Sequence, residues 1–318
     1  MPGDEEAKPR PRRALFYLKT GDPLLDERHP RGRNAAMSSV HIIKSPSEMT
    51  VWSDAARARG EHIAFVPTMG ALHAGHVSLL SAAKNRADLV VLSIFVNPTQ
   101  FGPNEDLARY PRDLVGDLAK AEGAGTAVAF VPEAKDMYPA SAQTFIEVRE
   151  VSQGLCGGRR PGHFVGVATV VAKLINIVRP HVALFGEKDF QQLAVIRRMV
   201  ADLNMPIEIV GEPTVREPDG LAMSSRNAYL SPVDRMRALA VSRGLSKARE
   251  RYTAGQRNAE ALVQAAMGII QPSVDGIDYV EIRDADTLAP VGNIDRPAVI
   301  LAAVYVGTTR LIDNLRLG

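Results

Sequence analysis

Short, unbroken apolar runs alternate with segments of helical periodicity through the first two thirds of the chain. The apolar run over 62–69 predicts a buried strand, and the partial helical spacing over 75–86 predicts a helix. A second apolar run over 89–96 predicts another strand, which Asn97 and Pro98 end. We therefore expect a strand–helix–strand unit with parallel strands and a right-handed crossover.

The same alternation continues beyond this unit. Further helices are predicted over 114–122, 165–178 and 191–203, and further strands over 128–131, 182–185 and 207–210. Continuous apolar strands that alternate with helices are typical of a parallel sheet covered on both faces. The fold class predicted is therefore α/β, with a Rossmann-like sheet, and ligands are expected at the carboxyl ends of its strands.

The pattern changes after about residue 213. Two helical stretches, 232–251 and 258–270, precede apolar strands over 277–282, 298–306 and 309–314, of which the last two form a hairpin around Gly307. This order predicts a smaller α+β domain. We expect a catalytic domain over 37–213 and a lid domain over 214–318, and 46% hydrophobic content in 318 residues is enough for two cores.

Charge separates the first 36 residues from the rest. They hold eight Lys or Arg and six Asp or Glu, and the remainder, with 30 of each sign, is neutral. Residues 1–36 are therefore interpreted as a disordered leader or as a start assigned ahead of Met37, and the body gives no sign of a nucleic-acid surface. The sequence has no run of about 18 apolar residues that would span a membrane. Its single cysteine, Cys156, fits a reducing compartment, so we expect a cytoplasmic protein.

The segment Pro67–His76 leaves the first strand and enters a helix. Its helix start offers free backbone N–H groups and positive potential, and its glycines allow a ligand close approach. His73 and His76, three residues apart, lie on one face and could donate hydrogen bonds to phosphate oxygens. Helix capping by the two histidines is the plain alternative. Zinc binding would need a third protein ligand.

The segment Phe95–Phe101 follows the second strand. Asn97 and Gln100 can each donate and accept hydrogen bonds, which suits a small substrate with hydroxyl and carboxylate groups. A solvent-facing turn set by Asn97 and Pro98 is the alternative.

Two further loops carry charge. In Phe185–Gln192 a strand runs through Gly186 into a helix, with Lys188 beside the helix start, where a phosphate would bind. In Met223–Asn227, near the domain junction, two hydroxyls and the guanidinium of Arg226 suit a polyphosphate. For each loop taken alone, a surface turn or simple helix capping remains an alternative interpretation. Taken together, the four loops predict a nucleotide-sized site.

These residues lie in motifs that together resemble the pantoate–β-alanine ligase family, within the HIGH-type nucleotidyltransferases, from Met37 to the C-terminus. The motifs are Pro67–His76, Ser93–Phe101, Leu107–Arg112, Arg160–Val167, Gly186–Leu193, Asp219–Leu230 and Thr308–Asn314. The resemblance implies ATP-dependent ligation of pantoate and β-alanine to pantothenate through a pantoyl adenylate, with release of AMP and pyrophosphate. It also implies a homodimer and the use of Mg²⁺.

The resemblance also implies site residues. ATP contacts fall on Met69, Gly70, Ala71, Leu72, His73, Ala74, Gly75, His76, Gly186, Glu187, Lys188, Asp189, Val215, Met223, Ser224, Ser225 and Arg226. The family's proton-donating histidine matches His76, its pantoate-binding glutamines match Gln100 and Gln192, and Asn97 and Tyr110 come to the same pocket. Relatives carry an acidic pair that helps to hold magnesium. Here Gly116 replaces its first member, which leaves Asp117 as the protein ligand expected.

The chemistry expected of these residues is charge compensation, because a carboxylate must attack a negatively charged phosphate. We expect His73, His76, Lys188, Ser224, Ser225 and Arg226 to act with Mg²⁺ in the catalytic group. No residue stands out as the base for the amine. The alternatives are another HIGH-type nucleotidyltransferase, an aminoacyl-tRNA synthetase, against which the neutral body speaks, and a non-catalytic ATP-binding regulator.

Overall fold

A parallel six-stranded sheet organises the N-terminal part of the chain. The computed structural model describes residues 40–103 and 105–318, so the expected leader, 1–36, lies outside the described residues. The strands are β1 (His41–Ile43), β2 (Ile63–Thr68), β3 (Leu89–Ile94), β4 (Val128–Phe130), β5 (Val182–Gly186) and β6 (Glu208–Glu212). Their spatial order is β1-β4-β3-β2-β5-β6, and every neighbouring pair is parallel. The predicted α/β class is confirmed.

Alternate side chains of the central strands enter two separate cores, as the pleat requires. Ile63 and Phe65 of β2 face one core, and Ala64 and Val66 face the other; all four are fully buried. The helices that cover the sheet are α1 (Pro46–Ala58), α2 (Ala74–Lys84), α3 (Leu114–Gly123), α6 (His163–Val178) and α7 (Phe190–Asp202). Helices α1, α6 and α7 pack on the first face, and α2 and α3 on the second. Apolar strands of this kind are stable only when both faces are covered.

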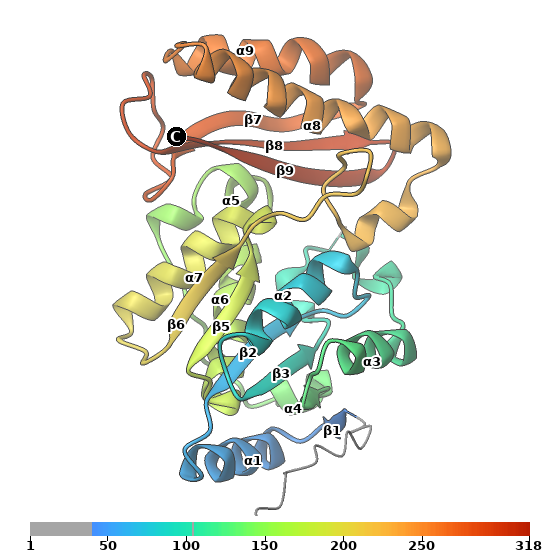
Figure 1. Cartoon of the computed structure of the whole chain (residues 1–318), viewed down its shortest axis with the longest axis vertical. Coiled ribbons are helices and arrows are strands. Elements are labelled where there is room, and N and C mark those ends of the chain that lie inside the picture. Colours follow the sequence, from blue (N-terminus) through green and yellow to red (C-terminus); the bar gives the residue numbers. More distant parts are fainter. Residues whose placement is uncertain (1–39, 104) are drawn as a thin grey trace, which may run out of the picture. The chain divides into compact units, whose positions relative to one another are not determined.

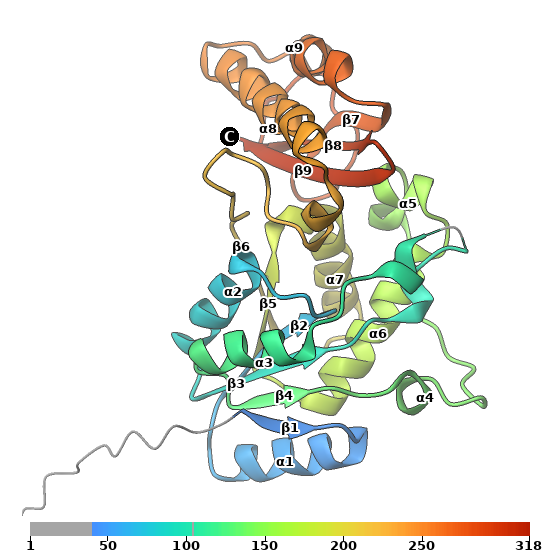
Figure 2. The same cartoon turned by 90° about the vertical axis from the view of Figure 1, so that its right-hand side faces the viewer.

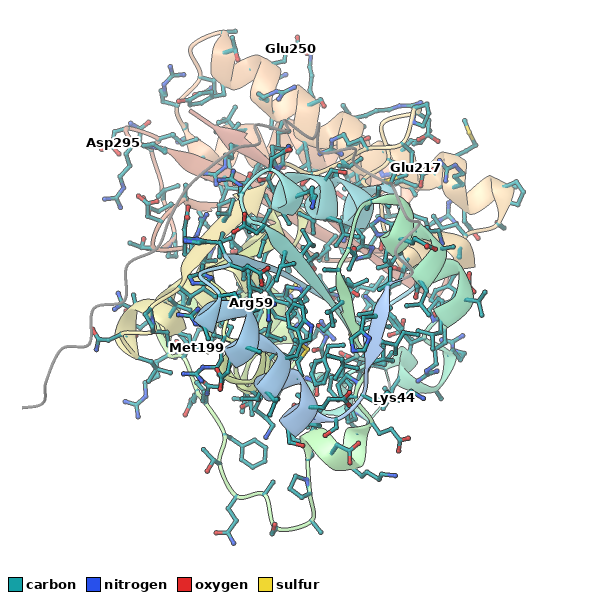
Figure 3. The ribbon with its side chains drawn as sticks, turned by 60° about the horizontal axis from the view of Figure 1, so that its bottom comes forward. Lys44, Arg59, Met199, Glu217, Glu250 and Asp295 are labelled. Carbon is teal, nitrogen blue, oxygen red and sulfur yellow. The ribbon has the colours of Figure 1, made fainter. Side chains whose placement is uncertain are left out.

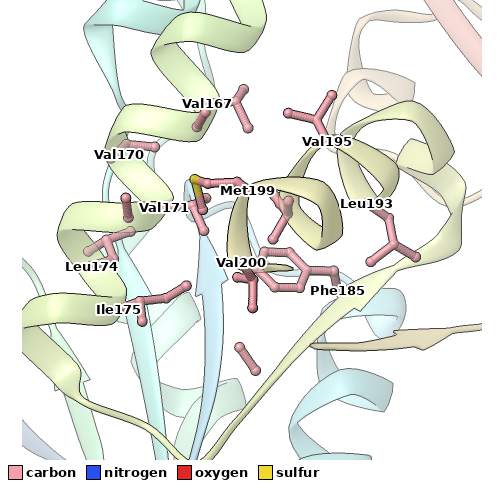
Figure 4. Packing of buried hydrophobic residues seen from close by; sticks show 14 of the residues in the cluster. Val167, Val170, Val171, Leu174, Ile175, Phe185, Leu193, Val195, Met199 and Val200 are labelled. Atoms are coloured by element: carbon pink, nitrogen blue, oxygen red, sulfur yellow. The ribbon is translucent and has the colours of Figure 1, made fainter. Parts of the chain in front are cut away.

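Helix α6 is the most buried of the helices that cover the sheet. Twelve of its 16 residues are buried, and its apolar side chains interdigitate with those of α7 (Figure 4). Val171 and Ile175 of α6 lie in the same core as Met199 of α7 and Phe185 of β5. This packing fixes both helices against the strands whose ends carry the predicted loops.

The C-terminal part contains the antiparallel sheet β7-β8-β9 (Figure 1). Its strands are β7 (Gly276–Asp284), β8 (Ala298–Val306) and β9 (Thr309–Leu317), and its helices are α8 (Pro232–Thr253) and α9 (Ala259–Ile270). Both helices cover one face of the sheet and share a core with it. The predicted hairpin is confirmed: Val306 pairs with Thr309, and Gly307 has a φ of +57°, which glycine adopts without strain.

The sequence patterns missed the first two elements. Strand β1 has three residues and lies at the sheet edge beside β4, with α1 next to it (Figure 2). Helix α1 lies between Lys44 and Arg59, both of which are labelled in Figure 3. It buries Met49, Ser53 and Ala56, so two of its three buried residues are too small or polar to make an apolar stripe. Two short helices, α4 (Ala134–Met137) and α5 (Leu155–Arg159), were also not predicted. Among the residues described, none of the helices could cross a membrane.

Candidate active site

A pocket opens at the carboxyl ends of β2 and β5, where the fold class predicts a ligand. The space within it, including open solvent at its mouth, is about 1170 Å³. The predicted residues that line it are Met69, His73, Gly75, His76, Gln100, Tyr110, Gly186, Lys188, Asp189, Gln192, Val215, Met223, Ser224, Ser225 and Arg226. Members of all four predicted loops therefore meet in one cavity.

The first loop brings the two histidines together at the start of α2. His73 is the N-cap residue, and the two imidazole rings lie 4.1 Å apart between centroids. The backbone N–H of His73 donates to Nδ1 of His76 at 3.3 Å. Because that nitrogen accepts, the neutral ring of His76 carries its proton on Nε2, from which it can donate to a ligand. Gly75 is tightly packed here, since a Cβ atom on it would lie 3.0 Å from the imidazole of His73.

Burial keeps both imidazoles neutral. Desolvation, followed by the charge of Lys188, lowers the pKa of His73 to about 4. Desolvation, followed by the neighbouring His73, lowers the pKa of His76 to about 3. Near pH 7 the pair therefore offers hydrogen-bond donors without positive charge. Among the residues described, no cluster of three or more His, Cys, Asp or Glu is suited to a metal ion.

Asp117, the magnesium ligand expected from the resemblance, is not among the residues that line the pocket. Asp117, on α3, has no exposed surface, and its two carboxylate oxygens accept hydrogen bonds from the backbone N–H groups of Ala71 and Leu72 at 2.8 and 2.6 Å. Gly70 and Ala71 have φ values of +85° and +50°, so this turn needs an external partner to hold it. Asp117 supports the loop ahead of His73 and does not line the pocket.

Asn97 lies behind the pocket and not on its wall. It is fully buried, and its Nδ2 donates to Oε1 of Gln100 at 3.1 Å and to the carbonyl of Gly166 at 3.2 Å. Its Oδ1 accepts from the hydroxyl of Tyr138 at 2.8 Å. With Oε1 of Gln100 engaged in this way, the NH₂ group of Gln100 is left toward the pocket, beside the sulfur of Met69 at 3.1 Å. Asn97, expected beside the substrate, therefore holds the amide oxygen of Gln100 and is not itself among the residues that line the pocket.

The third loop is a single turn, η4 (Glu187–Asp189), between β5 and α7. The side chain of Lys188 is 17% exposed and reaches the pocket, and its Nζ lies 3.9 Å from a carboxylate oxygen of Asp189. Glu187 points elsewhere and pairs with Arg316 at 2.7 Å. Lys188 is thus the member of this turn that brings positive charge to the cavity.

The fourth loop contacts the first. Ser225 begins the turn η5 (Ser225–Tyr229), and its hydroxyl donates to the carbonyl of Ala71 at 3.2 Å. Ser224 caps the turn by accepting from the backbone N–H of Arg226 at 3.3 Å. The guanidinium of Arg226 lies 5.9 Å from the ring centre of Tyr110. Residues about 150 positions apart in the chain therefore form one continuous wall.

Other ATP-contact residues implied by the resemblance support the loops without lining the cavity. They are Gly70, Ala71, Leu72, Ala74 and Glu187. Leu72, for example, is 3% exposed and belongs to the core between α2, α3 and the sheet.

Two ionisable residues of the cavity, Arg160 and His163, were not expected from the sequence. Arg160 donates to Nε2 of His163 at 3.0 Å, and Nδ1 of His163 donates in turn to the carbonyl of Gln100 at 2.8 Å. Desolvation, then the charge of Arg160, lowers the pKa of His163 to about 4. Both residues line the pocket. Their motif, Arg160–Val167, carries part of the family resemblance, but it does not follow a strand, where the α/β fold class predicts ligand-binding residues.

Comparison with known proteins gives one consistent result. The sequence model of the family described as pantoate-beta-alanine ligase matches residues 41–316. A pantothenate synthetase of Geobacter sulfurreducens is 57% identical over 281 residues, which cover 88% of this chain and 99% of that protein. A second, of Myxococcus xanthus, is 55% identical over 87% of this chain and 96% of its own length.

Solved structures agree with the sequence matches. The crystal structure of pantothenate synthetase from Thermus thermophilus matches with a TM-score of 0.82 at 43% identity, over 87% of this chain and 99% of that one. A pantoate-beta-alanine ligase from Francisella tularensis, complexed with beta-gamma ATP and beta-alanine, matches with a TM-score of 0.71 at 35% identity, over 87% and 97% of the two chains.

Proposed function

Because this chain belongs to the pantoate–β-alanine ligase family, we propose that the pocket at the ends of β2 and β5 is where it carries out the family's reaction. The reaction is the ATP-dependent ligation of pantoate and β-alanine. The observation that carries the assignment of the pocket is the convergence of His76, Lys188 and Arg226 from three separate loops on one cavity. Three donors of this kind match the needs of a polyphosphate.

In the first step we assign the charged and hydroxyl-bearing loops to ATP. A carboxylate oxygen of pantoate attacks the α-phosphorus, the bond to the β-phosphate breaks, and pyrophosphate leaves with its electron pair. Lys188 and Arg226 bring positive charge to the departing phosphates, and the neutral His73 and His76 donate hydrogen bonds without adding charge. Ser224 and Ser225 add hydroxyl groups to the wall that the fourth loop forms with the first.

In the second step the amine of β-alanine attacks the acyl carbon of the pantoyl adenylate. The bond to AMP breaks, AMP leaves with the electron pair, and the amine loses a proton. Gln100, Gln192 and Tyr110 line the same cavity and are assigned to the organic substrates. The NH₂ group of Gln100 is the donor that Asn97 leaves free for them.

Magnesium is assigned to the substrate complex Mg-ATP and not to a protein carboxylate. Asp117 has no exposed surface and does not line the pocket, and both its oxygens accept backbone N–H groups, so its position favours a role in holding the loop. Phosphate oxygens and water would supply the coordination. Magnesium bound there would offset phosphate charge, while the residues of this chain orient the reactants.

The test is product analysis with purified protein, Mg-ATP and pantoate, with and without β-alanine. We expect pyrophosphate from the first step and repeated formation of AMP only when the amine is present. Pyrophosphate without amine-dependent AMP would favour another nucleotidyltransferase, and ATP binding without turnover would favour a regulator.

Two variants test the assigned residues. His76→Ala and Lys188→Ala should fold normally and lose about a hundred- to thousand-fold in adenylate formation, the usual cost of one preorganised donor. The controls are His41→Ala, at an exposed site on β1, and Lys247→Ala, which removes a surface pair with Glu250 on α8. Near-wild-type turnover of either test variant would remove that residue from the catalytic group.

We also assign this protein to the cytoplasm as a homodimer, with residues 214–318 as a lid domain over 37–213. The family resemblance supports the dimer, and the single cysteine suits a reducing compartment. Light scattering should give twice the chain mass of 34.4 kDa. X-ray scattering should show compaction with a non-hydrolysable ATP analogue, and an unchanged radius would count against the lid.

A further inference from the structure

Strand β9 presents one row of side chains to its own domain and the other to the catalytic loops. Leu311 and Leu317 belong to the core that the C-terminal sheet forms with α8 and α9. The alternate residues Asn314 and Arg316 point the other way and contact η4. In both Figure 1 and Figure 2, β9 is the strand of the C-terminal sheet that lies nearest to the parallel sheet.

Asn314 holds the backbone of η4 at two successive points. Its Nδ2 donates to the carbonyl of Glu187 at 2.9 Å and to the carbonyl of Lys188 at 2.8 Å. Asn314 is 6% exposed, so these hydrogen bonds are shielded from water. The side-chain amide of Asn314 therefore donates both of its protons to this turn, one to Lys188 and one to the preceding Glu187.

Neighbouring residues of β9 brace the same region. Arg316 makes two hydrogen bonds to the carboxylate of Glu187, at 2.7 and 3.2 Å. Asp313 pairs with Arg216 through two hydrogen bonds of 2.7 and 2.9 Å, and Arg216 lies in the segment that leads to the fourth loop. Residues on both faces of β9 thus contact the turn that carries Lys188 and, through Arg216, the segment that leads to the fourth loop.

We propose that Asn314 is a positioning residue for Lys188, through which the C-terminal sheet sets the place of the ammonium group in the pocket. The proposal rests on the function proposed above for Lys188. The turn has only three residues between β5 and α7, so it has little internal hydrogen bonding of its own. Without the amide of Asn314, the carbonyls of Glu187 and Lys188 would lose their hydrogen-bond donors. The turn would then shift so that water could hydrogen-bond to them. A shift of about 1 Å at a reacting centre can cost about a hundredfold in rate.

The experiment is a double-mutant cycle on adenylate formation, measured as pyrophosphate release in single-turnover conditions. The variants are Asn314→Ala, Lys188→Ala and the double variant. Asn314→Ala should lower the rate about 10- to 100-fold, leave the KM for pantoate within about threefold, and lower the rate by less than about threefold when Lys188 is already absent.

Two further variants separate positioning from loss of stability. Asn314→Ser keeps one donor and should recover part of the rate, and it replaces Asn314→Ala in the cycle if that variant does not fold. Asp284→Asn is the matched control, because Asp284 is 3% exposed, caps two backbone N–H groups at the end of β7 and does not line the pocket. It should lose stability and keep its rate. Intrinsic fluorescence of Trp52, the single tryptophan, reports folding of each variant.

Each outcome decides the question. A folded Asn314→Ala protein with a wild-type rate would overturn the proposal, and so would an effect that adds in full to that of Lys188→Ala, since Asn314 would then act by another route. A Lys188→Ala variant with a wild-type rate of adenylate formation would instead overturn the function proposed for Lys188 itself. Partial recovery in Asn314→Ser together with non-additivity would establish positioning.

Discussion

Arg226, which lines the pocket, forms a bidentate ion pair with Asp106, with Nε to Oδ2 at 2.9 Å and Nη2 to Oδ1 at 2.8 Å. Burial opposes ionisation of Asp106, but the hydrogen bond and charge of Arg226 outweigh it and hold the pKa of the carboxyl below its usual value. Arg160 pairs in the same way with the adjacent Glu105, at 2.7 and 2.6 Å. Two arginines that line the pocket are therefore engaged by successive carboxylates of one loop.

Asp106→Asn should tighten ATP binding about 3- to 10-fold, because it removes a negative charge that competes with phosphate for Arg226. Calorimetric titration with ATP in the absence of pantoate would measure it. Asp275→Asn is the control, since its carboxylate pairs with Arg237 and lies outside the pocket lining. Weaker binding in Asp106→Asn would mean that the carboxylate orients Arg226 and does not compete with ATP.

The buried histidines should make the protein lose stability below neutral pH. His73, His76 and His163 have folded-state pKa values of about 4, 3 and 4, against 6.5 for the unfolded chain. The unfolded state therefore binds more protons, so stability is complete above pH 6.5 and falls as the pH drops toward 4. Each proton adds a slope of up to about 1.4 kcal/mol per pH unit.

Urea unfolding of wild type and His76→Gln between pH 6.5 and 5 would measure this slope, in a window where carboxylates stay largely ionised. The variant should show a shallower fall, by up to one proton. Parallel curves for the two proteins would refute the depressed pKa of His76.

Asp117→Asn should impair the enzyme without changing its need for magnesium. An amide in place of the carboxylate sets an NH₂ group against one of the backbone N–H groups of Ala71 and Leu72, so the loop before His73 should shift. We expect a loss of about 1–3 kcal/mol in stability and at least about a tenfold fall in kcat.

The Mg²⁺ concentration for half-maximal rate should stay at the wild-type value in Asp117→Asn. Asp284→Asn again serves as the control, since it removes a comparable buried carboxylate from two backbone N–H donors and should keep its kcat. A large rise in the Mg²⁺ requirement of Asp117→Asn alone would restore Asp117 as a metal ligand.

Gly166→Ala should weaken pantoate binding through Gln100. A Cβ atom on Gly166 would lie 2.3 Å from the carbonyl oxygen of Thr99 and 2.7 Å from the backbone N of Gln100, so α6 and this loop would have to separate. We expect a cost of about 1–3 kcal/mol in stability and a rise in the KM for pantoate that exceeds any rise for ATP.

Gly268→Ala is the matched helical control for Gly166→Ala, because a Cβ atom there meets nothing within 4 Å. It should be neutral or stabilising by up to about 1 kcal/mol. Equal changes in the KM for both substrates of Gly166→Ala would argue against a local effect on Gln100.

The chain by itself determined the sheet and the loops that surround the pocket. Strands buried on both faces must be continuously apolar, as in β2 and β3, and a glycine-bearing turn from a strand into a helix, as at 67–76, is typical of a phosphate-binding loop. Family motifs extended this to individual residues. Helix α1 was not predicted, because Ser53 and Ala56 occupy its buried face and leave no apolar stripe in the sequence.

Tertiary structure alone decided what each polar side chain faces. Asn97 stands in a motif segment and Asp117 follows one, yet both turn inward, where they hold Gln100 and the turn before His73. Asn314 is more than 120 positions from Lys188 and touches its backbone. Local spacing fixes the face of an element on which a side chain lies. The partner on that face comes from another part of the chain, and only packing of the whole fold brings the two together.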